Sequence, residues 1–181
     1  MSRDGRVMHR DEAIDATQRA AVIEATHAWI GRAGALYGRR FEPIPVLFDL
    51  SGRAAGMYRV QRGTRVIRYN PYLFAKYPHD SLTVTVPHEV AHYITERLYG
   101  LRRVRPHGPE WRAVMRDFGV DPAATADHDL DGIPGRRQRR HPYRCACLVH
   151  PLTTRRHNLI LRGARYRCRR CGDELVYSGA G

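Results

Sequence analysis

The sequence of 181 residues contains no long hydrophobic run. No segment is apolar over the length that a bilayer requires, and residues 1–15 include basic residues but lack the apolar stretch of a secretory signal peptide. We therefore expect a protein of the reducing cytoplasm that does not bind membranes. The composition is that of a globular protein, and the length allows one compact domain and a smaller module.

Cysteine is absent from the first 144 residues, and the last 37 hold all four. In a reducing compartment such clustered cysteines act as metal ligands more readily than as disulfides. Cys168 and Cys171 have the spacing of a zinc knuckle, whereas Cys145 and Cys147 are separated by a single residue. The ligand set is either all four thiolates, which are favoured as the softer ligands, or three of them plus His150. Such a closed site would hold a structural zinc that stabilises the fold.

Lysine is nearly absent, since Lys76 is the only lysine among 31 basic residues. The chain has 18 acidic residues, so its net charge is +13. The excess lies at the C-terminus, where residues 136–181 carry 12 arginines and only two acidic residues, Asp173 and Glu174. Such a cluster indicates a polyanionic partner, nucleic acid before a membrane surface, because phosphate contacts release counterions. The alternative is an arginine-rich face that is merely solvated.

Hydrophobic periodicity predicts an α+β fold in which helices pack on a short antiparallel sheet. A helix is expected over residues 11–35. Three β-like segments separated by turn signals predict an antiparallel meander. These segments are residues 45–50, 54–60 and 64–70. Two further helices are expected over residues 80–98, with a kink or a fresh start at Pro87, and over residues 109–119.

Composition divides the chain into three parts. Residues 1–120 contain these helices and strands and form the main domain. Residues 121–142 are rich in Asp, Pro, Gly and Arg without periodicity, which predicts a linker. Residues 143–181 form a basic cysteine-bearing module with strand-like runs at 158–161 and 175–177, and a module of this size needs a metal to fold.

The segment from Val84 to Gly100 reads VTVPHEVAHYITERLYG and places costly polar groups in an apolar helix. His88 and His92 are four residues apart, so they lie on one face of a helix and can bind one zinc ion. Glu89 can serve as general base for an attacking water without being a ligand. Metal binding explains the burial of these groups, and the alternative is a pair of core histidines without a metal.

Catalytic zinc needs a third protein ligand and an open position. The metzincin continuation fails, because Thr95 and Leu98 stand where that pattern has glycine and histidine. His107, in the loop after the helix, is favoured because imidazole suits zinc. Glu110 is its rival, because thermolysin-like enzymes use a glutamate in that role.

The arginines of the module are expected to bind DNA without sequence preference, single-stranded or distorted DNA being favoured because its bases are accessible. The candidates are Arg155, Arg156, Arg162, Arg165, Arg167, Arg169 and Arg170. Three tyrosines are available for stacking on bases, although tyrosines in a zinc ribbon more often pack within it. They are Tyr143, Tyr166 and Tyr177.

The motifs VPHEVAHYI, PHGPEWRAVM, YRCAC, RRHN and YRCRRCGDEL occur in an order that resembles the bacterial SprT-like proteins, which are related to the eukaryotic Spartan proteases. The resemblance extends from the first helix to about Val176. It implies a zincin-like metalloprotease domain followed by a C-terminal zinc ribbon. The positions that it assigns are His88, His92 and His107 as ligands of catalytic zinc, with Glu89 as the catalytic residue. By relation to Spartan, it implies cleavage of proteins bound or crosslinked to DNA.

The sequence therefore predicts a monomeric zinc endopeptidase with one catalytic and one structural zinc ion, acting on DNA-bound proteins. The competing class is a nucleic-acid-binding zinc protein whose HExxH metal is not catalytic. The intact Glu89 argues against this class, because a purely structural metal needs no base. A third possibility is a peptidase of small peptides without a DNA partner.

Overall fold

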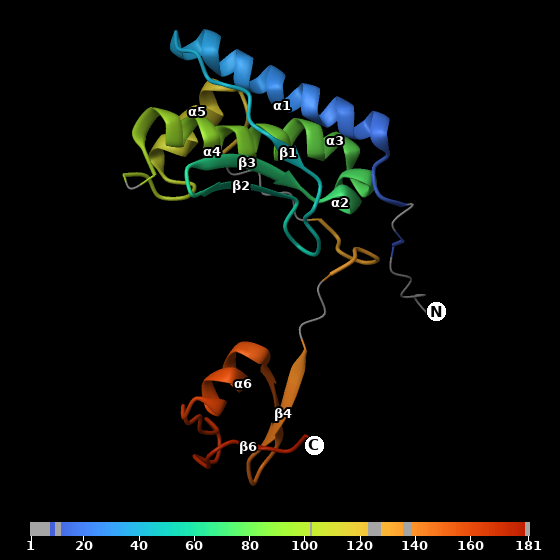
Figure 1. Ribbon diagram of the computed structural model, residues 1–181, viewed down its shortest axis with the longest axis vertical. Helices are drawn as coiled ribbons and strands as arrows, with labels where there is room; N and C mark the ends of the chain where they lie inside the picture. The colour runs from blue at the N-terminus through green and yellow to red at the C-terminus, as the bar shows by residue number, and fades with distance from the viewer. Residues whose placement is uncertain (1–7, 10–11, 102, 123–127, 136–138, 180–181) are drawn as a thin grey trace. The chain divides into compact units, whose positions relative to one another are not determined.

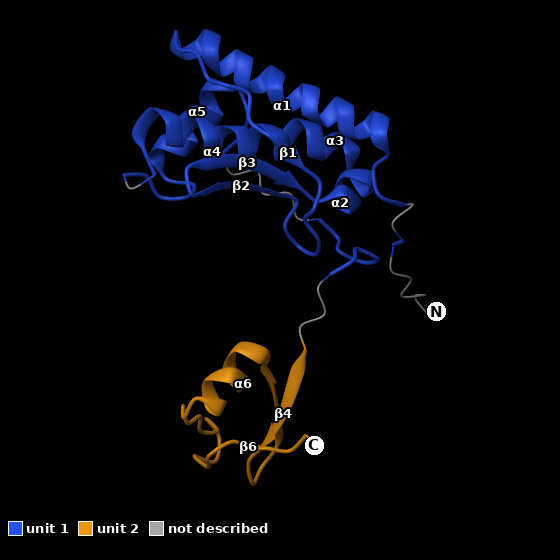
Figure 2. Cartoon of the chain, in the orientation of Figure 1, with its two compact units in different colours: residues 1–135 blue, residues 136–181 orange. Residues whose placement is uncertain are grey.

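The computed structural model describes residues 8–9, 12–101, 103–122, 128–135 and 139–179 (Figure 1). The chain divides into two compact units, residues 1–135 and residues 136–181 (Figure 2). Helices and small sheets occur in both units, so the predicted mixed α+β class is confirmed. Within the described residues, no helix has the length and apolar character needed to cross a membrane.

Helix α1 spans Ala16–Tyr37. Asp15 caps its N-terminus, because the Asp15 carboxylate accepts a hydrogen bond from the Gln18 amide while the Gln18 side chain accepts one from the Asp15 amide. The helix ends at Gly38, whose left-handed backbone (φ 57°) suits glycine. The predicted start is too early, because Asp15 has an extended backbone and the helix begins at Ala16, while residue 11 itself lies outside the described residues.

The first sheet has the strand order β1-β3-β2, with β1 at Val46–Leu47, β2 at Gly56–Gln61 and β3 at Thr64–Tyr69. Strands β2 and β3 form the expected antiparallel hairpin, but β1 pairs with β3 in parallel, so the predicted meander is wrong. The segment between β1 and β2 is long enough to carry the chain across β3 to the far edge. Strand β2 is therefore an edge strand.

A chain of short helical pieces leads to the central helix. Helix α2 (Pro71–Lys76) and α3 (Pro78–Asp80) are followed by a π-helical segment, η2 (Ser81–Thr85), and by α4 (Val86–Tyr99). Pro87 lies in the first turn of α4, but the Thr85 backbone before it is also helical, so the chain passes from the π-helix into the α-helix without a break. The kink or fresh start expected at Pro87 is replaced by this change of helix type. Gly100 ends the helix with a positive φ of 83°.

Helix α4 lies between α1 and the sheet, and α5 (Pro109–Asp117) packs beside it (Figure 1). The buried face of α4 supplies Val86, Val90 and Ile94 to the main core. Helix α5 adds Trp111 and Met115 to the same core. Burial on several sides explains why α4 can hold polar side chains in fixed positions.

The predicted linker, residues 121–142, is divided between the two units. Residues 123–127 and 136–138 lie outside the described residues. Between them, residues 128–135 pack on the first unit: the Gly52 amide donates to the Pro134 carbonyl (2.8 Å), and Lys76 pairs with Asp129 (3.2 Å). The last three residues of the predicted linker, 140–142, belong to the first strand of the second unit.

The second unit contains β4 (Arg140–Arg144), β5 (Val149–Thr153), α6 (Thr154–Leu161) and β6 (Val176–Tyr177), with the antiparallel strand order β5-β4-β6. The strand predicted at residues 158–161 is wrong, because these residues belong to α6. Thr153 caps this helix by accepting a hydrogen bond from the Arg156 amide. The strand predicted at 175–177 is confirmed for Val176 and Tyr177. A small core forms around Tyr143 and Leu152.

Candidate metal centres

Three imidazoles converge at the surface of the first unit. The Nε2 atoms lie 3.3 Å apart for His88 and His92, 3.1 Å for His92 and His107, and 3.0 Å for His88 and His107. Nitrogens held 2.0–2.1 Å from a tetrahedral zinc ion are about 3.3 Å from one another. The three side chains therefore fit as ligands of one zinc ion.

The backbone around His107 explains how a loop residue reaches the helix pair. His107 has a left-handed backbone (φ 56°), and Gly108 then starts α5 in an extended conformation. The Arg112 guanidinium donates to the His107 carbonyl oxygen (3.1 Å) and holds this turn. Glu110, the rival ligand, is not among the side chains that converge here. The structure thus brings His107 to the pair.

Trp111 lies behind the three imidazoles and is only 2% exposed. Its ring centroid lies 4.7 Å from His88, 5.4 Å from His92 and 4.7 Å from His107, and its indole N–H donates to the His88 carbonyl oxygen (3.4 Å). The indole therefore restricts the rotation of all three rings. Sequence reasoning missed this role, and the only signal was the position of Trp111 four residues after His107.

Burial first, and the neighbouring imidazoles second, lower the pKa of His88 to about 4 and that of His92 to about 3. Both rings are consequently neutral at pH 7. Neutral imidazole is the form that binds a metal.

Glu89 lies on the side of α4 that faces β2. Its Oε2 atom accepts a hydrogen bond from the Tyr58 amide (2.7 Å). Burial raises the pKa of Glu89 to about 7, although the Tyr58 amide opposes this shift. A carboxyl group with a pKa near neutrality can both take up and release a proton at physiological pH.

Gly56 on β2 provides the space for the Glu89 side chain. A Cβ atom at position 56 would lie 2.6 Å from Glu89 Cγ and 2.7 Å from Oε1. Any larger residue there has to displace either the carboxylate or the edge strand. Sequence reasoning missed Gly56, because the contact joins residues 33 positions apart.

Glu96, two turns after Glu89, ties α4 to the sheet. Its carboxylate accepts two hydrogen bonds from the Arg65 guanidinium (2.7 and 2.9 Å) and one from the Tyr58 hydroxyl (3.1 Å). The hydrogen bonds from Arg65 hold the pKa of Glu96 below its usual value of 4.5. Tyr58 therefore contacts both glutamates, one through its amide and one through its hydroxyl.

Replacing Glu96 with glutamine should lower the free energy of unfolding by about 2 kcal/mol at pH 7, because hydrogen bonds to a charged group are lost. A carboxyl group whose pKa is lower in the folded state than in the unfolded state stabilises the fold at pH values above its unfolded-state pKa. This stabilisation is lost as the pH falls through the folded-state pKa. The difference between wild type and Glu96→Gln should therefore shrink below about pH 4.5. Urea unfolding of both proteins between pH 7 and pH 3 measures this difference in stability. A difference that does not change with pH would contradict the role of the ionised Glu96 carboxylate.

A cleft of about 450 Å³ surrounds the imidazoles. Its walls come from β2, from the face of α4 that carries His88 and His92, and from the loop between α4 and α5. The residues that line it include Gly56, Met57, Tyr58, Glu89, Thr95, Leu101, Val104 and Arg105. The cleft is therefore a space in which a chain segment could reach both the imidazoles and Glu89.

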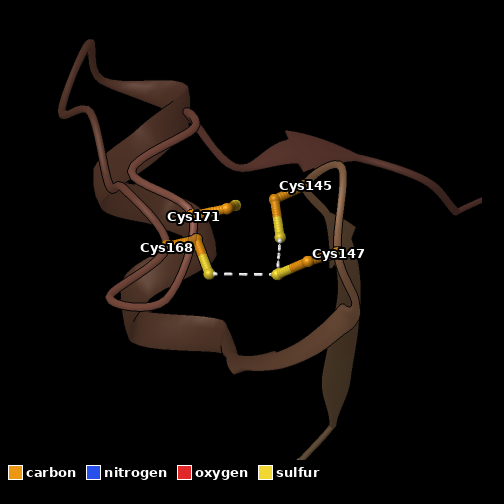
Figure 3. A group of neighbouring side chains, drawn as sticks. All are labelled: Cys145, Cys147, Cys168 and Cys171. Atoms are coloured by element: carbon orange, nitrogen blue, oxygen red, sulfur yellow. Dashed lines mark hydrogen bonds between the residues drawn. The ribbon is translucent and has the colours of Figure 1, made fainter.

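The four cysteines of the second unit converge in a separate cluster (Figure 3). The Sγ atoms are 3.4 Å apart for Cys145 and Cys147 and 3.6 Å apart for Cys147 and Cys168, and all four lie within 4.8 Å of one another. Thiolates held about 2.3 Å from a tetrahedral zinc ion are about 3.8 Å apart. The cluster fits one closed zinc site, as expected for a zinc ribbon.

Groups around the sulfurs support this fit. Hydrogen bonds from the backbone amides of Cys171 and Arg170 lower the pKa of the Cys168 thiol, which favours the thiolate that binds metal. His150 lies next to the cluster, with Nε2 3.3 Å from Cys145 Sγ. His150 is therefore placed as a hydrogen-bond partner of the Cys145 sulfur. The side chains whose ligand atoms converge are the four cysteines.

All seven candidate arginines are exposed. Arg165 pairs loosely with Glu174 (3.9 Å), and the Arg156 guanidinium lies over the Tyr166 ring. Tyr143 is buried and bonds through its hydroxyl to His157 Nδ1 (2.9 Å), so its predicted availability for base stacking is wrong. Tyr177 remains exposed. The second unit thus presents a basic surface on a small scaffold.

Comparisons with known proteins agree with these motifs. Residues 26–128 match the model of the SprT-like family. The chain is 42% identical over 144 residues to Protein SprT of Vibrio parahaemolyticus serotype O3:K6 (strain RIMD 2210633), which covers 78% of this chain and 83% of that protein. It is 39% identical over 147 residues to Protein SprT of Pseudomonas paraeruginosa (strain DSM 24068 / PA7), with 79% and 86% covered. No solved structure is significantly similar to the chain.

Proposed function

Because the chain belongs to the SprT-like family, we propose that it is a zinc-dependent endopeptidase of the zincin type that cleaves proteins bound or crosslinked to DNA. The observation that carries the proposal is the convergence of three imidazole Nε2 atoms within 3.3 Å beside a buried carboxylate. A structural metal site would need no such carboxylate and would have no open cleft in front of it.

The residues of the cleft suit peptide hydrolysis. When bound by His88, His92 and His107, zinc would polarise the scissile carbonyl and acidify the attacking water. Glu89 accepts the proton from that water and then delivers it to the leaving amine. The hydrogen bond from Tyr58 keeps the Glu89 carboxylate in place for both transfers. Among the described residues, β2 pairs with a strand on one side only, so an extended peptide could lie along its other side, where the Tyr58 amide is already bonded to Glu89.

Replacing Gly56 with alanine should lower the cleavage rate about 100-fold, because a displacement of the base by about 1 Å has an effect of that size. The added Cβ atom would collide with Glu89 Cγ at 2.6 Å. Initial rates on a protein substrate measure the effect. The matched control is Gly31→Ala in α1, where a Cβ atom would meet nothing within 4 Å. Equal rates for wild type and Gly56→Ala would show that Gly56 does not position the base.

The basic surface of the second unit would bring the enzyme to DNA and so raise the local concentration of DNA-bound substrates. Changing Arg155 and Arg156 of α6 and Arg162 at its C-terminal cap to glutamine should weaken binding to single-stranded DNA. The logarithm of the binding constant falls linearly with the logarithm of the salt concentration, and the magnitude of this slope should decrease by about 2. Each of the three phosphate contacts contributes about 0.7. Fluorescence anisotropy with a labelled oligonucleotide measures it. The control variant changes the exposed Arg53, Arg59 and Arg62 of the first unit. Equal slopes for the two variants would contradict the role of α6.

The experiment that tests the function compares one protein substrate in two forms, crosslinked to an oligonucleotide and free in the presence of that oligonucleotide. Zinc-loaded wild type should cleave the crosslinked form faster, and a chelator should stop the reaction. Cleavage of both forms at equal rates would remove DNA from the proposal. Cleavage of neither form, with tight DNA binding retained, would favour a nucleic-acid-binding protein with a non-catalytic metal.

A further inference from the structure

We propose that a set of exposed arginines beside the imidazole cleft binds the phosphate backbone of DNA, which gives the first unit a nucleic-acid contact of its own. These rim arginines are Arg103, Arg105, Arg112 and Arg116. The inference rests on the proposed function, and it adds a surface on the unit that carries the three imidazoles.

The positive charge of the first unit is concentrated in residues 97–116, which form the end of α4, the following loop and most of α5 (Figure 1). This segment contains six arginines and one acidic residue, Glu110, for a net charge of +5. The other residues of the first unit contain 13 basic and 15 acidic side chains, for a net charge of −2. A unit that is slightly acidic elsewhere therefore carries one strongly basic segment, and such a segment attracts polyanions.

The rim arginines lie around His107, one of the three converging imidazoles. Arg105 lines the cleft, and its carbonyl oxygen accepts a hydrogen bond from the Gly108 amide (2.9 Å), which closes the turn that contains His107. The Arg112 Nε atom donates to the His107 carbonyl oxygen (3.1 Å). Arg116 follows Arg112 by four residues, so it lies on the same face of α5, about 6 Å farther along the helix axis. The basic surface therefore begins at the cleft and continues along α5.

The rim arginines are available to an external anion. All four are exposed, and no acidic side chain pairs with any of them in the part of the chain that the structure describes. Two acidic residues that flank the segment are engaged elsewhere. The Glu96 carboxylate accepts hydrogen bonds from Arg65, and the Asp117 carboxylate accepts one from the Tyr37 hydroxyl. The charge of the rim arginines is therefore open to a ligand.

A repeating anion fits this arrangement better than a single carboxylate does. The four guanidinium groups are spread over the loop and along α5, so successive phosphates of a strand can engage them in turn. The planar guanidinium also matches phosphate with paired hydrogen bonds. The alternative is a carboxylate of the protein substrate, which would engage Arg105, the rim arginine that lines the cleft. A strand held by the rim arginines would place a protein crosslinked to it beside the imidazoles.

The first experiment measures how salt weakens the binding of the full-length protein to a labelled single-stranded oligonucleotide. In the rim variant, Arg103, Arg105 and Arg116 are changed to glutamine, while Arg112 is kept because it holds the turn at His107. The logarithm of the binding constant falls linearly with the logarithm of the salt concentration. The magnitude of this slope should be smaller by about 2 in the rim variant, since each of the three phosphate contacts contributes about 0.7.

The control variant loses the same charge elsewhere on the first unit, at Arg53, Arg59 and Arg62, and should keep the wild-type slope. A wild-type slope in the rim variant overturns the proposal. If that variant then binds an aspartate-containing peptide more weakly than wild type does, these arginines recognise carboxylates of the substrate. Equal decreases of the slope in both variants also overturn the proposal, because the effect would then come from total charge.

A second experiment needs neither a variant nor proteolysis. Wild type is irradiated with an oligonucleotide that contains 5-iodouracil, and mass spectrometry locates the crosslinked peptides. Crosslinks within residues 97–116 are expected beside those in the second unit, and crosslinks confined to the second unit overturn the proposal. Both experiments record binding, so a protein that cleaves no substrate can still confirm this surface, and an active protease can still refute it.

Discussion

Replacing Glu89 with glutamine should reduce cleavage of a DNA-crosslinked protein by about 10²- to 10⁴-fold, the usual contribution of a general base. Glutamine keeps the shape of the side chain and can still accept the hydrogen bond from the Tyr58 amide, but it cannot take up a proton. The three imidazoles are unchanged. The variant should therefore retain zinc at this site, as measured by metal analysis, while single-turnover assays show the loss of hydrolysis.

The control for this experiment is Glu110→Gln, which alters a neighbouring carboxylate that does not converge with the imidazoles. Its cleavage rate should stay close to that of wild type. Undiminished proteolysis by Glu89→Gln would show that another group serves as base. Loss of zinc from the variant would instead make the carboxylate part of the metal site.

Replacing Cys168 with serine should unfold the second unit, the largest structural effect that we expect. The small core around Tyr143 cannot stabilise this unit alone, and structural zinc supplies roughly 10–16 kcal/mol of apparent binding free energy in zinc-finger peptides. The bound zinc should fall from two ions to one per chain. Amide signals of the second unit in an NMR spectrum should collapse to unfolded positions, whereas those of the first unit persist.

His150→Asn is the matched variant, because His150 contacts a sulfur without belonging to the converging four cysteines. It should keep two zinc ions and a folded second unit. Loss of the second zinc from His150→Asn would make His150 a ligand. A second unit that stays folded in Cys168→Ser, or in the presence of a chelator, would contradict a structural zinc.

The sequence predicted the helix that carries His88 and His92 well because the relevant signal is local. A spacing of four residues places His88 and His92 on one helix face whatever the tertiary structure, and Pro109 marks the next helix start. The position of His107 followed from its place in the short connection between these helices. The structure brings these three side chains together, and their role as ligands stays a prediction.

The parts that could not be predicted depend on long-range contacts. Alternation of apolar residues identifies a strand but not its neighbour or its direction, so the parallel pairing of β1 with β3 was missed. The apolar run at residues 158–161 is too short to distinguish a strand from a helix. Gly56 and Tyr58 contact Glu89 across the fold, and no spacing in the sequence relates them to it. Trp111 contacts His88 and His92 across the fold, and the only sequence signal for it is its place four residues after His107.

The most direct test of the central claim is an anomalous difference map at the zinc edge from crystals of the zinc-loaded protein. We predict one peak within about 2.0–2.1 Å of the Nε2 atoms of His88, His92 and His107, with no protein atom at its fourth position. A second peak should lie within about 2.3 Å of the four cysteine sulfurs. The absence of a peak among the imidazoles, or a peak enclosed by four protein ligands there, would contradict a catalytic zinc.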